Sequence, residues 1–234
     1  MELRSLNRKK MNLDVLIEIM NLIGDVAFAV SGAMTAIEKK MDIFGVCMLG
    51  IVTTVGGGMT RDVLLGIVPP VALRNPLDIG VATLVSCIVF VWVARKKHRN
   101  QNQNPITTNM LNVSDAIGLG IFTVIGINVA QGQLKDADAF IMIVVGVITG
   151  VGGGVLRDVF SGSIPYIFKK HVYALASAVG AIAYVVLDDF VGVVWATLLC
   201  AVLVIVIRLL ATYYRWNLPR IQEMEEDIGS HTEP

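Results

Sequence analysis

Long apolar stretches, separated by short charged or Pro- and Asn-rich breaks, run along nearly the whole chain. A helix needs roughly 20 mostly apolar residues to cross the hydrocarbon core of a bilayer, and backbone polar groups inside lipid must bond to one another. The pattern therefore predicts an all-α integral membrane protein with seven transmembrane helices. The predicted spans are Leu13–Met34, Ile43–Val68, Leu77–Ala94, Leu111–Ala130, Phe140–Ile164, Val172–Leu187 and Phe190–Leu210.

A repeated motif divides these spans into two sets. The sequence GGGMTRDV at Gly56–Val63 recurs as GGGVLRDV at Gly152–Val159, and Phe28–Gly32 matches Phe122–Gly126. Each copy holds three spans, an odd number, so the second copy must enter the membrane in the opposite sense. The predicted regions are a basic N-terminal segment (1–12), the first three-helix repeat (13–97), a polar linker (98–110), the second, inverted repeat (111–187), a seventh helix (188–211) and an acidic C-terminal tail (212–234).

Lysine and arginine residues predict the orientation, because cytoplasmic loops are enriched in them. The opposite loops contain only Arg74 and Lys135, so the C-terminus is predicted to be cytoplasmic. With seven spans, however, the basic segment Arg4–Lys10 lies outside, which disagrees with this rule. Either the basic residues of the later loops outweigh this segment, or Met11 is the true start. The basic residues on the C-terminal side are Lys39, Lys40, Arg95–Arg99, Lys169, Lys170, Arg208, Arg215 and Arg220.

Each triple glycine lies near the centre of its span. Three consecutive glycines, at about 1 kcal/mol each relative to alanine, make a continuous helix costly. We therefore expect the second and fifth helices to be kinked or unwound there, and the freed backbone groups to need water, an ion or a side chain as partners. The residues concerned are Gly56, Gly57, Gly58, Gly152, Gly153 and Gly154.

An arginine and an aspartate follow each triple glycine, still at hydrocarbon depth, where ionisable groups are expensive and face protein or a water-filled cavity. Neighbouring residues on a helix point about 100° apart, so we expect each arginine to find its partner on another helix. One possibility is the crossed pairs Arg61–Asp158 and Arg157–Asp62; the other is that the arginines reach Asp25 and Asp115. A path beside the motifs could also include Thr53, Thr60 and Thr149, together with Ser31, Thr54, Thr123, Asn128 and Gln131.

An alternative gives these motifs a purely structural role. Glycines permit close helix packing, the charges would form a closed ion-pair network, and each hydroxyl would bond back to its own helix. Packing alone, however, does not require broken helices, buried charge and inverted symmetry together. Their coincidence favours a transport site.

Composition excludes other classes of function. Hydrophobic residues make up 55% of the 234 residues and charged residues only 16%, which is typical of a membrane protein, and the net charge of zero implies no general affinity for nucleic acid. Cys47, Cys87 and Cys200 lie inside apolar stretches at unrelated spacings, which indicates packed thiols rather than disulfides or metal ligands. No phosphate loop, zinc motif or nucleophile and base arrangement predicts an enzyme, and no cofactor is expected.

The doubled GGGxxRD motif, the run DVAFAVSG from Asp25 and its counterpart SDAIGLGIF resemble the bacterial and archaeal members of the trimeric intracellular cation (TRIC) channel family, over about Leu13 to Leu210. The resemblance implies a homotrimer in the plasma membrane, surrounded by lipid, with an hourglass pore inside each protomer. It implies permeation by monovalent cations, chiefly K⁺, with Na⁺ as a further candidate, past the second and fifth helices. Eukaryotic relatives carry a lysine-rich motif where this chain has Arg61 and Arg157, so their gating is not carried over.

The same bacterial family also suggests a glycine transporter. In that alternative, the two arginines would clamp a carboxylate and the two halves would rock to alternate access. A channel would instead use carbonyls, hydroxyls and acidic groups that bind ions weakly.

Overall fold

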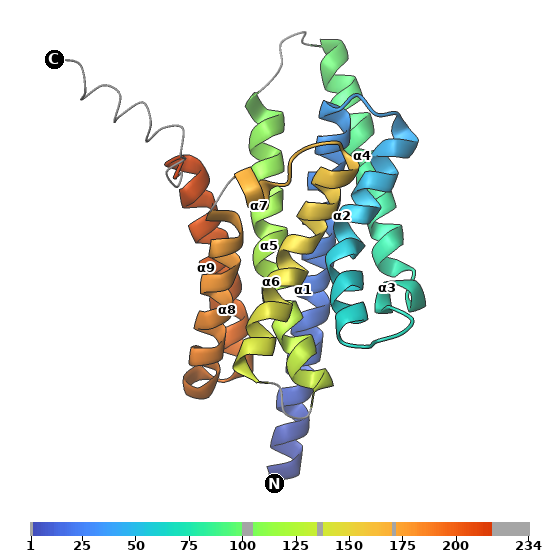
Figure 1. Ribbon diagram of the computed structural model, residues 1–234. Coiled ribbons are helices and arrows are strands. Elements are labelled where there is room, and N and C mark those ends of the chain that lie inside the picture. The colour runs from blue at the N-terminus through green and yellow to red at the C-terminus, as the bar shows by residue number, and fades with distance from the viewer. Residues whose placement is uncertain (1, 100–104, 135–137, 170–171, 217–234) are drawn as a thin grey trace, which may run out of the picture.

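The computed structural model describes residues 2–99, 105–134, 138–169 and 172–216. Within these residues the chain is entirely helical, with seven long helices and two of a single turn, and contains no strand. The helices run roughly along one common axis (Figure 1). They are α1 (Glu2–Glu38), α2 (Ile43–Leu64), α3 (Val71–Arg74), α4 (Leu77–Arg99), α5 (Pro105–Gln133), α6 (Ala139–Phe160), α7 (Tyr166–Lys169), α8 (Val172–Val191) and α9 (Val193–Tyr213).

The outside of the bundle is apolar, as a lipid-facing surface must be. Six helices, α2, α4, α5, α6, α8 and α9, are long and apolar enough to cross a membrane. Large side chains such as Val63, Leu84 and Val202 are exposed on them. Helix α1 is the seventh long helix of the described residues, and one face of its second half, from Met20 to Ala36, is packed inside the bundle, while Leu22 and Ile23 are exposed. The chain is therefore an all-α membrane protein, while the crossing by α1 stays a prediction.

Helices α1, α2, α5 and α6 form the centre of the bundle, with α4 on one flank and α8 and α9 on the other (Figure 1). Phe28 of α1 and Phe122 of α5 meet there, with ring centroids 5.0 Å apart. Each ring lies against a glycine of the other helix, Phe28 against Gly118 and Phe122 against Gly24. The two predicted copies thus contact each other through equivalent residues.

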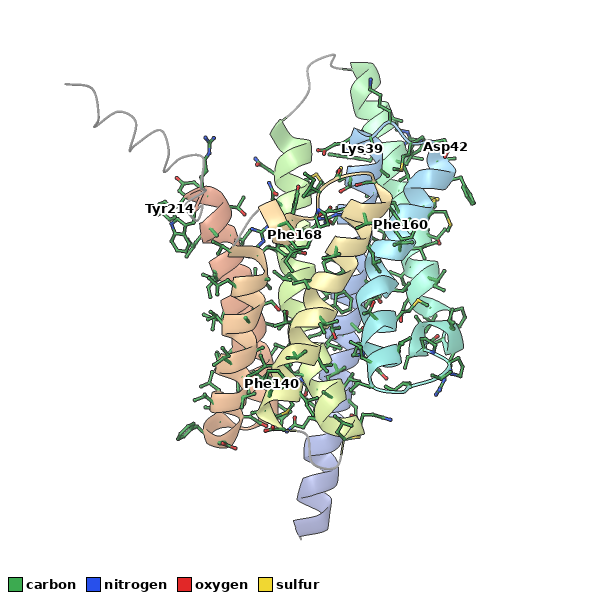
Figure 2. All side chains as sticks on the ribbon, in the orientation of Figure 1. Lys39, Asp42, Phe140, Phe160, Phe168 and Tyr214 are labelled. Carbon is green, nitrogen blue, oxygen red and sulfur yellow. The ribbon has the colours of Figure 1, made fainter. Side chains whose placement is uncertain are left out.

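The two copies are arranged upside down relative to one another. The single-turn helices α3 and α7, which follow the two glycine-containing helices, lie at opposite ends of the bundle (Figure 1). Lys39 and Asp42 lie at the same end as Phe160 and Tyr214, whereas Phe140, at the start of α6, lies at the other end (Figure 2). Helix α1 begins at the end of the bundle opposite to that at which α9 finishes, which agrees with the predicted odd number of spans (Figure 1).

Glycines in the left-handed region end α2 and α6 earlier than the predicted Val68 and Ile164. Gly66 has φ +71° and Gly162 has φ +68°. The next residue in each loop donates its N–H to the carbonyl of Asp62 or Asp158, at 2.8 Å in both cases. This is the Schellman arrangement, which terminates a helix by satisfying its last carbonyls. Both loops then form a short second helix.

Both ends of the predicted polar linker 98–110 are helical, because they belong to the neighbouring long helices. Helix α4 continues to Arg99 and α5 already begins at Pro105, because a proline at the first helical position costs no hydrogen bond. At the N-terminus, the predicted segment 1–12 is helical from Glu2 and continuous with α1. Residues 100–104 and most of the predicted acidic tail, 217–234, lie outside the described residues.

Candidate ion pathway

The two triple glycines face each other where α2 crosses α6. A Cβ atom on Gly57 would overlap the carbonyl oxygen of Thr149, and a Cβ atom on Gly153 would overlap the carbonyl oxygen of Thr53. A Cβ atom on Gly152 would come within 3.0 Å of the Cα atom of Gly57. The glycines therefore allow backbone-to-backbone contact between the two helices.

Of the two predicted outcomes at these glycines, the unwound turn is wrong, while a kink stays a prediction. Both α2 and α6 are helical throughout, from Ile43 to Leu64 and from Ala139 to Phe160. The helix propensity of glycine is a weak preference that tertiary contacts override. Here the contact between the two backbones replaces the side-chain packing that the glycines lack.

Threonines beside this crossing bond back to their own helices. The hydroxyls of Thr53 and Thr149 are fully buried and donate to the carbonyls of Leu49 and Val145, each at 2.6 Å. Thr60 does not belong to the interior, because it is exposed on the outside of α2 and donates to its own helix at Gly56. The structural alternative, in which each hydroxyl bonds back to its own helix, is therefore the one observed for these threonines.

Other polar residues of the predicted path connect helices away from the glycines. Thr123 lies 2.7 Å from Ser177 of α8, between their two hydroxyl oxygens. Asn128 donates to Thr197 of α9 at 3.1 Å, and Gln131 donates to Asp188 of α8. These contacts hold the flank formed by α8 and α9 against α5.

The crossed ion pairs predicted from the sequence do not form. Arg61 pairs with its own neighbour, Asp62, through Nε at 2.9 Å and Nη2 at 2.7 Å. Arg157 likewise donates from Nε to Asp158 at 2.9 Å. The argument from helix geometry failed because the long arginine side chain reaches around the final turn of the helix to the next residue.

The loops after the two helices hold these aspartates in place. The second carboxylate oxygen of Asp62 accepts the N–H of Val71, the first residue of α3, at 2.8 Å. The second oxygen of Asp158 accepts the N–H of Tyr166, the first residue of α7, also at 2.8 Å. Each aspartate thus connects its arginine to the start of a short helix, where an anion is favoured.

The two arginines lie on opposite sides of the glycine crossing. Each is four residues beyond the middle glycine of its motif, which corresponds to roughly 6 Å along the helix axis. Because α2 and α6 run in opposite directions, these displacements point away from each other (Figure 1). The structure therefore contains two separate charged sites rather than one central network.

The site at Arg157 is completely closed. Arg157 is 0% exposed and, besides Asp158, binds Asp115 at 2.6 Å and the hydroxyl of Ser31. The second predicted possibility, a contact with Asp115, is thus confirmed. The guanidinium also lies 5.1 Å from the centre of the Tyr166 ring.

Sequence reasoning missed two members of this closed site, Tyr173 and Arg208. The Tyr173 hydroxyl donates to Asp115 at 3.3 Å. Arg208 of α9 is 2% exposed, covers the Tyr173 ring at 4.7 Å and approaches Asp115 to 3.9 Å. The available signal was an arginine within the last turn of the predicted span Phe190–Leu210, where the sequence pattern indicates a basic residue at the cytoplasmic end.

The site at Arg61, in contrast, opens into a cavity of about 530 Å³ between α1, α2, α4 and α5. Four carboxyl groups and one guanidinium line it, so acidic side chains outnumber basic ones in the cavity. It extends inwards to Thr54 and Gly58, beside the glycine crossing. The charged lining residues are Glu18, Asp25, Arg61, Asp62 and Asp78.

Asp25 also lines this cavity. Among the described residues, it forms no hydrogen bond with Arg61, so the predicted contact between these two side chains is not observed. Asn21 donates one amide group to both Asp25, at 3.1 Å, and Asp78, at 3.3 Å. Asn21 occupies the position equivalent to Asp115 in the second copy, 94 residues later. An amide in one copy and a carboxylate in the other therefore distinguish the open site from the closed one.

Fold and sites define a class of protein: a multi-spanning helical membrane protein with an inverted repeat and buried charge beside a glycine crossing. The sequence profile of the family described as "Glycine transporter" matches residues 18–94 and 112–189, one segment in each repeat. The chain belongs to this family, which also includes membrane proteins named UPF0126 and the prokaryotic TRIC channels.

Close relatives cover almost the entire chain. The UPF0126 inner membrane protein YadS of Escherichia coli (strain K12) is 36% identical over 88% of this chain and 96% of its own length. The UPF0126 membrane protein YvgT of Bacillus subtilis (strain 168) is 34% identical over 86% of this chain and 95% of its own.

Solved structures show the same fold. A prokaryotic TRIC channel crystallised in 0.5 M KCl has a TM-score of 0.78 and 30% identity, covering 87% of this chain and 99% of the other. A TRIC cation channel studied for its conductance has a TM-score of 0.73 and 36% identity, covering 87% and 96%. The TRIC trimeric intracellular cation channel orthologue of Rhodobacter sphaeroides has a TM-score of 0.77 and 30% identity, covering 86% and 99%.

Proposed function

We propose that this protein is a cation channel rather than an enzyme, permeable to monovalent cations including K⁺ and Na⁺. It would work as a homotrimer in the inner membrane, surrounded by lipid, with an hourglass pore in each protomer and the C-terminus in the cytoplasm. Support comes from relatives named inner membrane proteins and from structural neighbours described as TRIC cation channels. The single observation that carries the proposal is the acidic cavity that leads to the glycine crossing.

The charge of this cavity suits cation entry. Four carboxylates against one guanidinium concentrate cations at the mouth. Arg61 is neutralised by Asp62 at 2.7 Å, so it does not present an unpaired positive charge to a cation. Beyond the crossing, the two arginines and two aspartates of the closed site balance one another. In this proposal the cavity is the hydrated entrance on one side of the pore, the closed site at Arg157 blocks the other side, and opening would require the contacts of Arg157 to rearrange.

The functional test is a flux measurement. Purified protein in K⁺-loaded liposomes should release K⁺ when a membrane voltage is imposed, at a rate proportional to the protein content and without any added amino acid. Protein-free liposomes with the same lipids give the background. Voltage-driven K⁺ release no faster than this background would contradict the channel.

Glycine transport is the second candidate, because the family profile bears that description. A transporter would show saturable uptake of labelled glycine into the same liposomes and would compete with unlabelled glycine. Such uptake without voltage-driven K⁺ flux would replace the channel proposal by the transporter.

A further inference from the structure

The sulfur atoms of two cysteines from different helices approach each other closely. Cys47 of α2 and Cys87 of α4 have their Sγ atoms 3.5 Å apart, and both thiols are free and half-buried. The spacing of 40 residues in the sequence did not indicate this pairing, which depends on how α2 packs against α4. Cys200, the third cysteine, is 0% exposed and lies on α9.

The two helices also lie close together beside these cysteines. A Cβ atom on Gly50 would overlap the hydroxyl oxygen of Ser86. Gly50 lies one turn after Cys47 on α2, and Ser86 directly precedes Cys87 on α4. A disulfide needs Cβ atoms roughly 3.5–4.5 Å apart, so the helices that carry the cysteines must approach closely. The small residues Gly50 and Ser86 allow this approach.

We infer that Cys47 and Cys87 form a modification site, a dithiol that a two-electron oxidant closes to an intramolecular disulfide. Two S–H bonds break and one S–S bond forms. With an azodicarboxamide oxidant such as diamide, the two electrons and two protons reduce the N=N bond to a hydrazine. The bond joins α2, which carries the glycine crossing and Arg61, to the flanking helix α4.

The test uses the full-length protein in its membrane. Membranes are treated with diamide, free thiols are blocked with a maleimide, and the purified protein is digested and analysed by mass spectrometry. We expect a peptide pair linked through Cys47 and Cys87 that dithiothreitol separates, with Cys200 remaining unlinked. The Cys47→Ser and Cys87→Ser variants should each lack the linked pair, whereas Cys200→Ser should retain it.

Two results would overturn the inference. One is the absence of the linked pair after oxidation with either diamide or copper phenanthroline. The other is linkage between protomers, seen as a dithiothreitol-sensitive dimer on a denaturing gel. Because the readout is a covalent bond, it does not depend on whether the protein conducts cations.

A second variant tests the role of the close approach. Gly50→Ala should crowd α4, because the added methyl group would lie 3.3 Å from the Cβ atom of Ser86 even after the hydroxyl rotates away, and should reduce the yield of the linked pair. Gly80→Ala on α4, where a Cβ atom meets nothing within 4 Å, is the matched control and should leave the yield unchanged. Equal yields in the two variants would show that the cysteines do not meet in the way the structure places them.

Discussion

Asp115 is held between two arginines in a part of the protein from which water is excluded. One carboxylate oxygen accepts from Arg157 at 2.6 Å, while the other lies 3.9 Å from Arg208 and has no hydrogen-bond partner among the described residues. Removing one member of a buried ion pair leaves the other charge unpaired, which typically costs about 3–5 kcal/mol. Asp115 therefore carries more of the stability of this region than a surface acid would.

We predict that Asp115→Asn lowers the temperature of thermal unfolding in detergent by several degrees, because Asp158 is then the one remaining carboxylate, among the described residues, that balances the two buried guanidinium groups of this site. The matched control is Asp189→Asn, at an exposed position in the last turn of α8. Both variants lose one negative charge. Identical unfolding temperatures would mean that Asp115 does not stabilise the arginines.

Individual residue roles were only partly predictable from the sequence. The contact between an arginine and Asp115 was one of the two predicted possibilities, and it is confirmed for Arg157. The pairing of Arg61 with Asp62 did not follow, since it depends on the loop amide that turns the carboxylate towards the arginine. Sequence spacing on a helix contains no information about such a loop.

At the scale of the helices, the contact between α2 and α6 rests on glycine. The overlaps that a side chain would make at Gly57 and Gly153 are with backbone oxygens, which cannot rotate away as a flexible side chain can. The sequence showed where the glycines were but favoured a broken helix, because propensity describes a helix in isolation. The contact that favours continuous helix comes from the backbone of the other glycine-containing helix, which lies in the other repeat and is far away in the sequence.

We predict that Gly57→Ala destabilises the protein by about 1–3 kcal/mol, the usual cost of overpacking a core, because α2 and α6 must separate. Gly80→Ala introduces the same methyl group on α4 where a Cβ atom meets nothing within 4 Å. It should leave stability unchanged or raise it slightly, through the better helix propensity of alanine. Denaturation in detergent, followed by circular dichroism, compares the two. A Gly57→Ala protein as stable as Gly80→Ala would refute the backbone contact.

For the molecule as a whole, the inverted repeat was visible in the sequence because the motif recurs with its flanking residues. The difference between the two halves was not. It arises because the first copy has Asn21 at the position where the second copy has Asp115. It also arises because Arg208 comes from α9, a helix that belongs to neither copy. A comparison of the copies with each other cannot reveal a contribution from a helix that neither contains.

We predict that Asp78→Asn slows K⁺ flux roughly threefold at low ionic strength. A unit charge about 7 Å from the passing ion is worth roughly 0.6 kcal/mol in water. The effect should shrink in concentrated salt, because mobile ions screen the cavity. Asp189→Asn removes the same charge at a position that does not line the cavity. An Asp78→Asn protein that matches this control at every salt concentration would exclude the cavity from the route of the ions.

The glycine crossing also limits how this protein can be altered. Where α2 and α6 touch, the contacting atoms are peptide groups, which every amino acid shares, so replacing one residue by another offers no means of fine adjustment there. Variation that changes which solutes pass, whether by natural drift or in the laboratory, has to act from the cavity on one side of the crossing or from the buried charges on the other. The centre itself tolerates only the smallest residue.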